Sequence, residues 1–133
     1  ATPFRPAQPL RLLIVDDLED SLLLFKKFMK ELPCKVETAA NGQDAVEKFK
    51  QGIFDIVLMD MLMPVMDGYT ATREIRAWEK EQGRKPVPII ALTANAMKED
   101  AQMCLDSGCD LHLCKPIGKA RLIETLAQYC RRE

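Results

Sequence analysis

The chain has 133 residues, 47% of them hydrophobic and 29% charged, so it is long enough for one globular domain with a substantial core. Its formal net charge of −1 excludes the strongly basic surface typical of nucleic-acid-binding domains. No apolar run approaches the roughly 18 residues that a membrane span needs, and no signal-peptide pattern opens the chain, so we expect a cytoplasmic domain without membrane contact.

The first ten residues contain three prolines without a repeat, which predicts a linker or tail over residues 1–10 ahead of a domain at 11–133. Because the chain starts without Met, we expect it to have been cut from a longer protein or processed. The five cysteines are odd in number and form no C-x-x-C, which favours free core thiols in a reducing compartment. A zinc or redox role for them is the alternative.

The first half of the domain predicts a strand, a helix, a second strand and a second helix. Residues 12–15 are continuously apolar, as in a buried parallel strand, whereas residues 34–38 alternate in polarity, as in an edge strand. The inward face of the helix between them is predicted to carry Leu18, Leu22, Phe25 and Met29. The next helix is predicted to start after Asn41-Gly42, with Ala45, Val46 and Phe49 inward.

The second half repeats this alternation three times. Residues 56–59 and 87–92 are continuously apolar, and residues 110–114 alternate in polarity. A helix is predicted after each of these three strands, with one set of residues facing the core. The inward residues are Ala71, Ile75 and Trp78 in the first helix, Met97, Ala101, Cys104 and Leu105 in the second, and Leu122, Ile123, Leu126 and Cys130 in the third. Gly108 is placed to end the second of these helices.

Five strands alternating with five helices predict an α/β fold with a doubly wound, five-stranded parallel sheet. The continuously apolar strands belong in the middle, and the alternating second and fifth strands belong at the edges. These placements satisfy the flavodoxin-like strand order 2-1-3-4-5.

The polar residues that follow the strands are the candidate site. Asp16 and Asp17 follow the first strand, Asp60 the third, Thr93 the fourth and Lys115 the fifth. Ligands of such sheets bind beyond the carboxyl ends of the strands, where the strand order reverses. We therefore expect these five side chains to meet in one pocket.

Three converging carboxylates repel one another, by about 4 kcal/mol for a pair at 4 Å and an effective dielectric constant of 20. A divalent cation relieves this repulsion, and oxygen ligands without His or Cys favour Mg²⁺, or Mn²⁺, over zinc. Mg²⁺ commonly keeps coordination positions for phosphate oxygens. The acids therefore predict a metal site that also receives a phosphate.

A carboxylate such as Asp60 can act as a nucleophile and form an aspartyl-phosphate. Mg²⁺ and Lys115 would neutralise the transferred group, and Thr93 would donate a hydrogen bond to it. No strong base for the reverse hydrolysis is evident, which favours a switch over an enzyme with turnover. Taken singly, the acid pair at 16–17 could also be a helix cap, Thr93 a turn residue and Lys115 a solvated charge.

Four segments resemble the receiver domain of two-component response regulators: L-L-I-V-D-D at 12–17, D-I-V-L-M-D-M-L-M-P-V-M-D-G at 55–68, A-L-T-A at 91–94 and K-P at 115–116. The resemblance covers about residues 11–130. The second and third segments are most similar to receivers fused to sensor kinases, the hybrid histidine kinases. The resemblance therefore implies a phosphorelay protein, and a cytoplasmic part of a membrane-anchored kinase is one expected setting.

The resemblance also implies the role of each residue. Asp60 would be the phosphoacceptor, and Asp16, Asp17, Asp60 and the main-chain carbonyl of Leu62 would hold Mg²⁺. Thr93 and Lys115 would contact the phosphoryl group, and the bond before Pro116 would be cis. The donor would be a phosphohistidine on a histidine kinase or a histidine phosphotransfer domain. The isolated domain would not be an enzyme, although it would assist its own phosphorylation and dephosphorylation.

His112 departs from the receiver pattern, which often has Tyr or Phe at this position as a ring that turns inward on activation. An imidazole can rotate in the same way, but it brings a polar ring with a pKa near 6.5. His112 is therefore a candidate switch residue together with Thr93, and a half-exposed edge-strand residue is the alternative.

Two other functions remain open at this point. A Mg²⁺-dependent phosphatase of the haloacid-dehalogenase type also uses an Asp at a strand end, but it needs D-x-D, and here Met61-Leu62 follows Asp60. A phosphorylation-independent interaction module would bind its partner through residues 96–106, residues 110–114 and the last helix.

Overall fold

Five parallel strands form one sheet in the predicted order β2-β1-β3-β4-β5. The strands are β1 (Leu10–Val15), β2 (Cys34–Ala39), β3 (Ile56–Asp60), β4 (Ile89–Thr93) and β5 (Leu111–Cys114). The computed structural model describes residues 9–30, 32–94 and 98–129. Most of the predicted tail, and the predicted inward residues Met97 and Cys130, lie outside these ranges.

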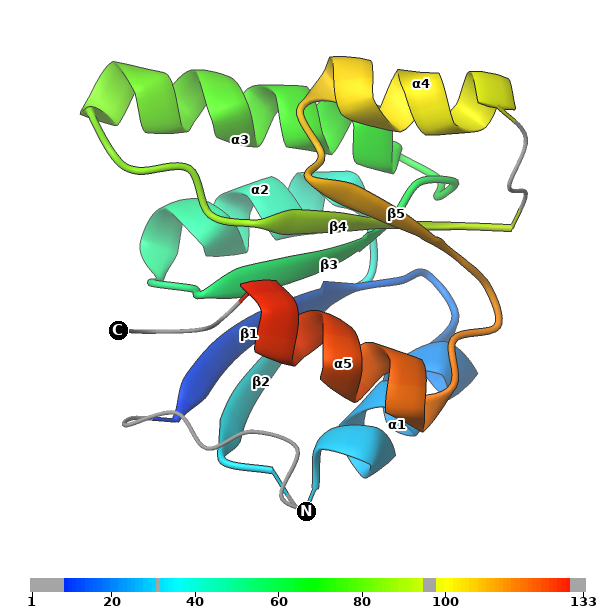
Figure 1. Cartoon of the computed structure of the whole chain (residues 1–133). Helices are drawn as coiled ribbons and strands as arrows, with labels where there is room; N and C mark the ends of the chain where they lie inside the picture. The colour runs from blue at the N-terminus through cyan, green and yellow to red at the C-terminus, as the bar shows by residue number, and fades with distance from the viewer. Residues whose placement is uncertain (1–8, 31, 95–97, 130–133) are drawn as a thin grey trace.

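Five helices connect and follow the strands, as predicted. They are α1 (Glu19–Met29), α2 (Gly42–Gln51), α3 (Gly68–Gln82), α4 (Lys98–Ser107) and α5 (Lys119–Tyr129). Figure 1 shows α1 and α5 on one face of the sheet and α2, α3 and α4 on the other. Within the described ranges, no helix combines the length and the apolarity that crossing a bilayer requires.

The pleat of the strands explains why both faces are covered. In β1, Leu13 and Val15 pack on the side of α2 and α3, whereas Leu12 and Ile14 pack on the side of α1 and α5. Every residue of β3 and of β4 is buried. Strands that are apolar on both faces exclude water only when helices cover both, so the continuous apolar runs specify the two-sided architecture.

Two leucines predicted to face inward are exposed instead. Leu18 is 57% exposed because it precedes α1 as an extended N-cap residue and does not share the helical face of Phe25 and Met29. Leu105 is 51% exposed, one residue after the fully buried Cys104 on α4. Consecutive residues of an α-helix lie about 100° apart around its axis, so Leu105 points away from the side on which Cys104 meets the core.

The cysteines are free thiols at the four positions that the structure describes, Cys34, Cys104, Cys109 and Cys114. Burial raises the pKa of Cys34 and of Cys109 to about 11, so both stay protonated at neutral pH. Protonated thiols are poor metal ligands and poor nucleophiles. Cys104 and Cys109 are buried, in agreement with the predicted role of cysteine as a small apolar residue, whereas Cys34 is half-buried and Cys114 is exposed.

Candidate functional site

Three carboxylates from two neighbouring strands converge at the carboxyl edge of the sheet. Asp16 and Asp17 follow β1 and Asp60 ends β3, and one oxygen of each lies within 4.8 Å of the others. The pairing of β1 with β3 brings them together, because Val15 is the register partner of Met59. Asp16 is fully buried, Asp60 is 6% exposed and Asp17 is exposed. The predicted acidic pocket therefore exists, and it opens to solvent at Asp17.

Lys115 lies between two of these acids. Its Nζ is 2.8 Å from Asp16 Oδ2 and 3.4 Å from Asp60 Oδ2. Burial acts to lower the pKa of Lys115, but the two carboxylates outweigh it and the pKa is raised, so the amine stays cationic. In this structure Lys115 thus pairs more closely with Asp16 than with the predicted phosphoacceptor.

The carboxyl end of β4 supplies the neighbouring wall of the site. Thr93 is buried, and its carbonyl accepts a hydrogen bond of 2.7 Å from the backbone N–H of Lys115. That bond places β4 and β5 so that Thr93 and Lys115 lie at the same edge as Asp60. The peptide bond between Lys115 and Pro116 is cis.

Asp60 is held by weak contacts, so its charge is poorly compensated. Its Oδ1 accepts a 3.3 Å hydrogen bond from the backbone N–H of Leu62, and its Oδ2 faces Lys115 at 3.4 Å. Burial raises the pKa of Asp60 and the charge of Asp16 raises it further, while Lys115 and the Leu62 N–H oppose the rise. The net effect is a raised pKa, which indicates a carboxylate left with unused capacity for a cation or a new bond.

Asp16 differs from Asp60 in that its hydrogen bonds are shorter. Its Oδ1 accepts a 2.9 Å hydrogen bond from the backbone N–H of Leu18, and its Oδ2 accepts from Lys115. The backbone N–H of Asp16 in turn donates to Ala39 at the end of β2. These contacts hold Asp16 in one orientation, which gives the pocket a fixed wall.

The turn between β3 and α3 closes over Asp60. The N–H of Gly68 donates to the Met61 carbonyl at 2.9 Å, and a Cβ on Gly68 would lie 2.3 Å from the Asp60 carbonyl oxygen. The Asp67 side chain caps α3 by accepting from the Thr70 N–H. Only glycine fits so close a backbone approach, so Asp67-Gly68 keeps the turn tight against the site.

A divalent cation suits the donors that this pocket presents. All three of its acidic groups offer oxygen, and no cysteine or histidine belongs to the cluster among the residues that the structure describes. Hard cations such as Mg²⁺ bind such oxygen sets. Leu62, whose carbonyl is the fourth predicted ligand, follows in the same turn with its side chain 69% exposed.

His112 lies away from the acids, in the middle of the edge strand β5. It is the register partner of Ala91 and is half-buried. Its neighbours Leu111 and Leu113 pack on the side of α1 and α5, so the pleat directs His112 to the opposite side, where α4 lies. Its predicted part in switching stays a prediction.

A second polar cluster, which the sequence did not reveal, lies around Arg76 of α3. Its guanidinium group contacts Glu79, Val87, Gly108 and Asp110. Two of these partners are main-chain carbonyls, and Gly108 and Asp110 are 32 and 34 residues away in the chain. No local pattern signals such contacts, because they exist only once α3, β4 and β5 are packed together.

Comparisons with known proteins agree with this geometry. The family model described as response regulator receiver domain matches residues 12–127. The sensor protein GacS of Pseudomonas syringae pv. syringae is 41% identical over 119 residues, which cover 90% of this chain but 13% of GacS. The chain thus spans about an eighth of the length of this relative.

Two solved structures are similar over almost the whole chain. The co-crystal structure of the Saccharomyces cerevisiae phosphotransfer protein Ypd1 and the receiver domain of the response regulator Ssk1 gives a TM-score of 0.88 at 31% identity, covering 92% of this chain and 89% of that one. The receiver domain of sensor histidine kinase PA1611 from Pseudomonas aeruginosa, with a magnesium ion in its active-site cleft, gives 0.83 at 37% identity, covering 93% and 99%. From its fold, its acidic pocket and these matches, the chain belongs to the response regulator receiver domains, which act in phosphorelay signal transduction.

Proposed function

We propose that Asp60 accepts a phosphoryl group and that the domain changes its partner contacts in response. The observation that carries this proposal is the convergence of the Asp16, Asp17 and Asp60 carboxylates, with Lys115 Nζ 3.4 Å from Asp60 Oδ2. A carboxylate with weak hydrogen bonds is free to attack, and a neighbouring amine stabilises the charge that develops on the transferred group. The phosphorylated residue would add negative charge and draw Thr93, Lys115 and the region near His112 into new contacts.

Mg²⁺ is the cofactor that we assign to Asp16, Asp17 and Asp60, with the Leu62 carbonyl as a further ligand. The oxygen-only donor set supports Mg²⁺, and Mn²⁺ has the same ligand preference. The magnesium ion in the PA1611 receiver structure supports the same assignment. When bound, the ion would supply positive charge for the phosphate oxygens.

Phosphorylation by a small-molecule donor tests the assignment of Asp60. The domain incubated with Mg²⁺ and acetyl phosphate is expected to gain the mass of about one phosphoryl group in intact-protein mass spectrometry. Asp60→Asn removes the nucleophile and should abolish the gain. Asp20→Asn makes the same change at an exposed acid of α1 and should leave it intact. Equal phosphorylation of wild type and Asp60→Asn would refute the proposal, and steady hydrolysis of small phosphate esters would favour the phosphatase alternative.

The donor, we infer, is a phosphohistidine on a histidine kinase or on a histidine phosphotransfer domain. The Ypd1–Ssk1 co-crystal structure supports a partner of this kind. Large apolar side chains are exposed around the acidic pocket and on α1: Leu18, Leu23, Leu24, Leu62 and Val65. Exposed leucines beside a reactive pocket suit the docking of an apolar partner surface.

Replacement of one exposed leucine on α1 tests partner docking independently of the phosphorylation reaction at Asp60. Leu24→Ser is expected to slow transfer from a phosphorylated phosphotransfer domain by about tenfold, the size of a modest interface hot spot. Phosphorylation by acetyl phosphate should be unchanged, because a small donor needs no docking surface. Leu105→Ser, at an exposed leucine of α4, is the matched control. Equal transfer rates for both variants would contradict docking on α1.

Within the longer protein, we assign this domain to a hybrid histidine kinase. GacS supports this, and so does the 42% identity, over 117 residues, to hybrid signal transduction histidine kinase M of Dictyostelium discoideum. The isolated domain would not turn over substrates by itself. Free thiols at four positions suit the reducing cytoplasm, where we place the domain.

A further inference from the structure

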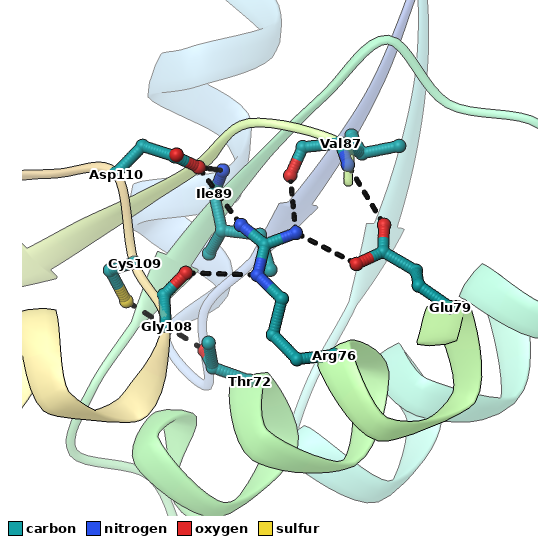
Figure 2. A network of polar contacts seen from close by, with 8 residues as sticks. All are labelled: Thr72, Arg76, Glu79, Val87, Ile89, Gly108, Cys109 and Asp110. Carbon is teal, nitrogen blue, oxygen red and sulfur yellow. Dashed lines mark hydrogen bonds and ion pairs between the residues drawn. The ribbon is translucent and has the colours of Figure 1, made fainter. Parts of the chain in front are cut away.

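The polar contacts around Arg76 join α3, the segment that leads into β4 and the turn before β5 (Figure 2). We name Arg76, Glu79, Val87, Gly108 and Asp110 the Arg76 cluster. Nε of Arg76 donates to the Gly108 carbonyl at 2.9 Å, and Nη1 donates to the Val87 carbonyl at 2.8 Å. The same guanidinium pairs with Glu79 at 2.8 Å and with Asp110 at 2.9 Å.

The two acids of the Arg76 cluster also bind the backbone at the start of β4. Glu79, which is 2% exposed, accepts from the Val87 N–H at 2.8 Å through its second oxygen. Asp110 accepts from the Ile89 N–H at 2.8 Å. Charge-assisted bonds of this kind are stronger than neutral ones, and in the buried Arg76–Glu79 pair the loss of one partner strands the other charge. The Asp110 side chain is 42% exposed, so its ion pair with Arg76 contributes less. The cluster is therefore a rigid junction between α3, β4 and the turn before β5.

The end of α4 is fastened to this junction. Gly108 has φ +112, and its N–H and that of Cys109 donate to the carbonyls of Leu105 and Cys104, which is the Schellman arrangement. A Cβ on Gly108 would lie 2.8 Å from Cγ of Arg76. The Cys109 thiol lies 3.8 Å from the Thr72 hydroxyl of α3. The helix terminus is thus held by its cap, by Arg76 and by α3.

The two ends of α4 lie at different distances from Asp60. The chain leaves the carboxyl end of β4 at Thr93 and enters α4 at Lys98, so the start of α4 is the end of this helix that lies toward the carboxyl edge of the sheet (Figure 1). Ten residues of helix carry the other end about 15 Å farther along the axis. The Arg76 cluster contacts β4 near Ile89, about 13 Å of strand away from Thr93. It cannot touch a group bound at Asp60.

We propose that the Arg76 cluster anchors the C-terminal end of α4, so that the response to a phosphoryl group on Asp60 is confined to the start of α4 and to the carboxyl edge of the sheet. The proposal rests on the proposed function of Asp60. An anchored terminus turns a displacement at the carboxyl end of β4 into a tilt of α4 about its far end, because a helix moves as a rigid element. The helix α4 would change orientation while its connection to β5 stays in place.

Amide hydrogen exchange and chemical shifts test this anchor. In the wild type without ligand, the amides of residues 104–110 are expected to be protected. Arg76→Ala should speed their exchange about tenfold or more, the factor expected for loss of a charge-assisted hydrogen bond. Arg73→Ala removes an exposed arginine one turn away on α3 and is the control. If Arg76→Ala does not fold, Asp110→Asn removes the ion pair while its side-chain oxygen can still accept from Ile89.

Addition of Mg²⁺ and beryllofluoride, which mimics a phosphoryl group, supplies the second readout. In the wild type, resonances of residues 98–101 should shift while those of 104–110 stay in place, and in Arg76→Ala the shifts should extend through Asp110. Equal shifts at both ends of α4 in the wild type, or identical exchange in Arg76→Ala and Arg73→Ala, would overturn the anchor. If beryllofluoride shifts no resonances of the wild type, the proposed function of Asp60 is refuted. The amide exchange rates measured without ligand would still test the proposed anchor in that case.

Discussion

Asp60 carries its carboxylate in surroundings that disfavour the charge. Burial and the negative charge of Asp16 raise its pKa, and Lys115 offsets this incompletely because it lies closer to Asp16, at 2.8 Å against 3.4 Å. A group with a raised pKa in the folded state is less stable when ionised, so at neutral pH Asp60 lowers the stability of the metal-free domain. A cation bound at Asp60 would offset this cost by neutralising the carboxylate charge.

Asp60→Asn should therefore stabilise the metal-free domain at neutral pH. Above the raised pKa of Asp60 the unfolding free energy of the variant should exceed that of the wild type. The difference should shrink as the pH falls through that pKa, and should vanish below the ordinary value near 3.8. Urea unfolding in EDTA between pH 3 and 8, followed by Trp78 fluorescence, measures it. A wild type more stable than the variant at pH 7 would contradict the assigned direction of the shift.

The turn from β3 into α3 works as one element because two backbone segments touch there. Gly68 carries no side chain that would separate the helix start from the Asp60 carbonyl. A second contact ties this turn to α2, since the Gly42 N–H donates to the Met66 carbonyl at 2.9 Å. The turn therefore fixes the backbone of Asp60, while the side chain of Asp60 faces Lys115 and Asp16.

Gly68→Ala is expected to destabilise the domain by about 1–3 kcal/mol, the usual cost of forcing extra atoms into a packed site. The new methyl group would meet the Asp60 carbonyl oxygen at 2.3 Å. Gly118→Ala is the matched control, because nothing lies within 4 Å of a Cβ there, and its effect should stay within about 0.5 kcal/mol. Thermal or urea unfolding compares the two, and equal stabilities would show that the turn can relax.

At the scale of the whole molecule, binding at the pocket is coupled to folding because the three acids come together only in the folded chain. Asp16 and Asp17 lie 44 and 43 residues before Asp60 in the sequence. A ligand that binds only the folded state raises the unfolding free energy by mass action. The assigned cation should thus act as a stabiliser of the entire domain.

Mg²⁺ at about a hundred times its dissociation constant should raise the unfolding free energy by about 2.7 kcal/mol, and EDTA should reverse the effect. Asp17→Asn removes an exposed acid of the pocket and should abolish most of the gain without unfolding the domain. Glu19→Gln, an exposed acid two residues farther along, serves as the comparison. A gain that survives Asp17→Asn would place the cation elsewhere.

Much of this architecture could be predicted because local patterns and sheet geometry agree. The continuous runs 12–15 and 56–59 identified central strands, and the parallel arrangement then brought Asp16 and Asp60 to one edge. The exposure of Leu18 and Leu105 could not be predicted in this way. Helical spacing shows which residues share a face, but it does not show where a helix starts or which side meets the core.

By itself, the sequence determined the order of elements, the strand order and the set of residues at the carboxyl edge. These follow from hydrophobic periodicity and from the short connections that a parallel sheet requires. Only the tertiary structure decided that Lys115 pairs most closely with Asp16 and that Arg76 joins α3 to the end of α4. Lys115 and Asp16 are 99 residues apart in the chain, and Arg76 and Gly108 are 32 residues apart. Such contacts depend on the directions of side chains and on main-chain carbonyls that meet only in the folded chain, so no pattern within one segment predicts them.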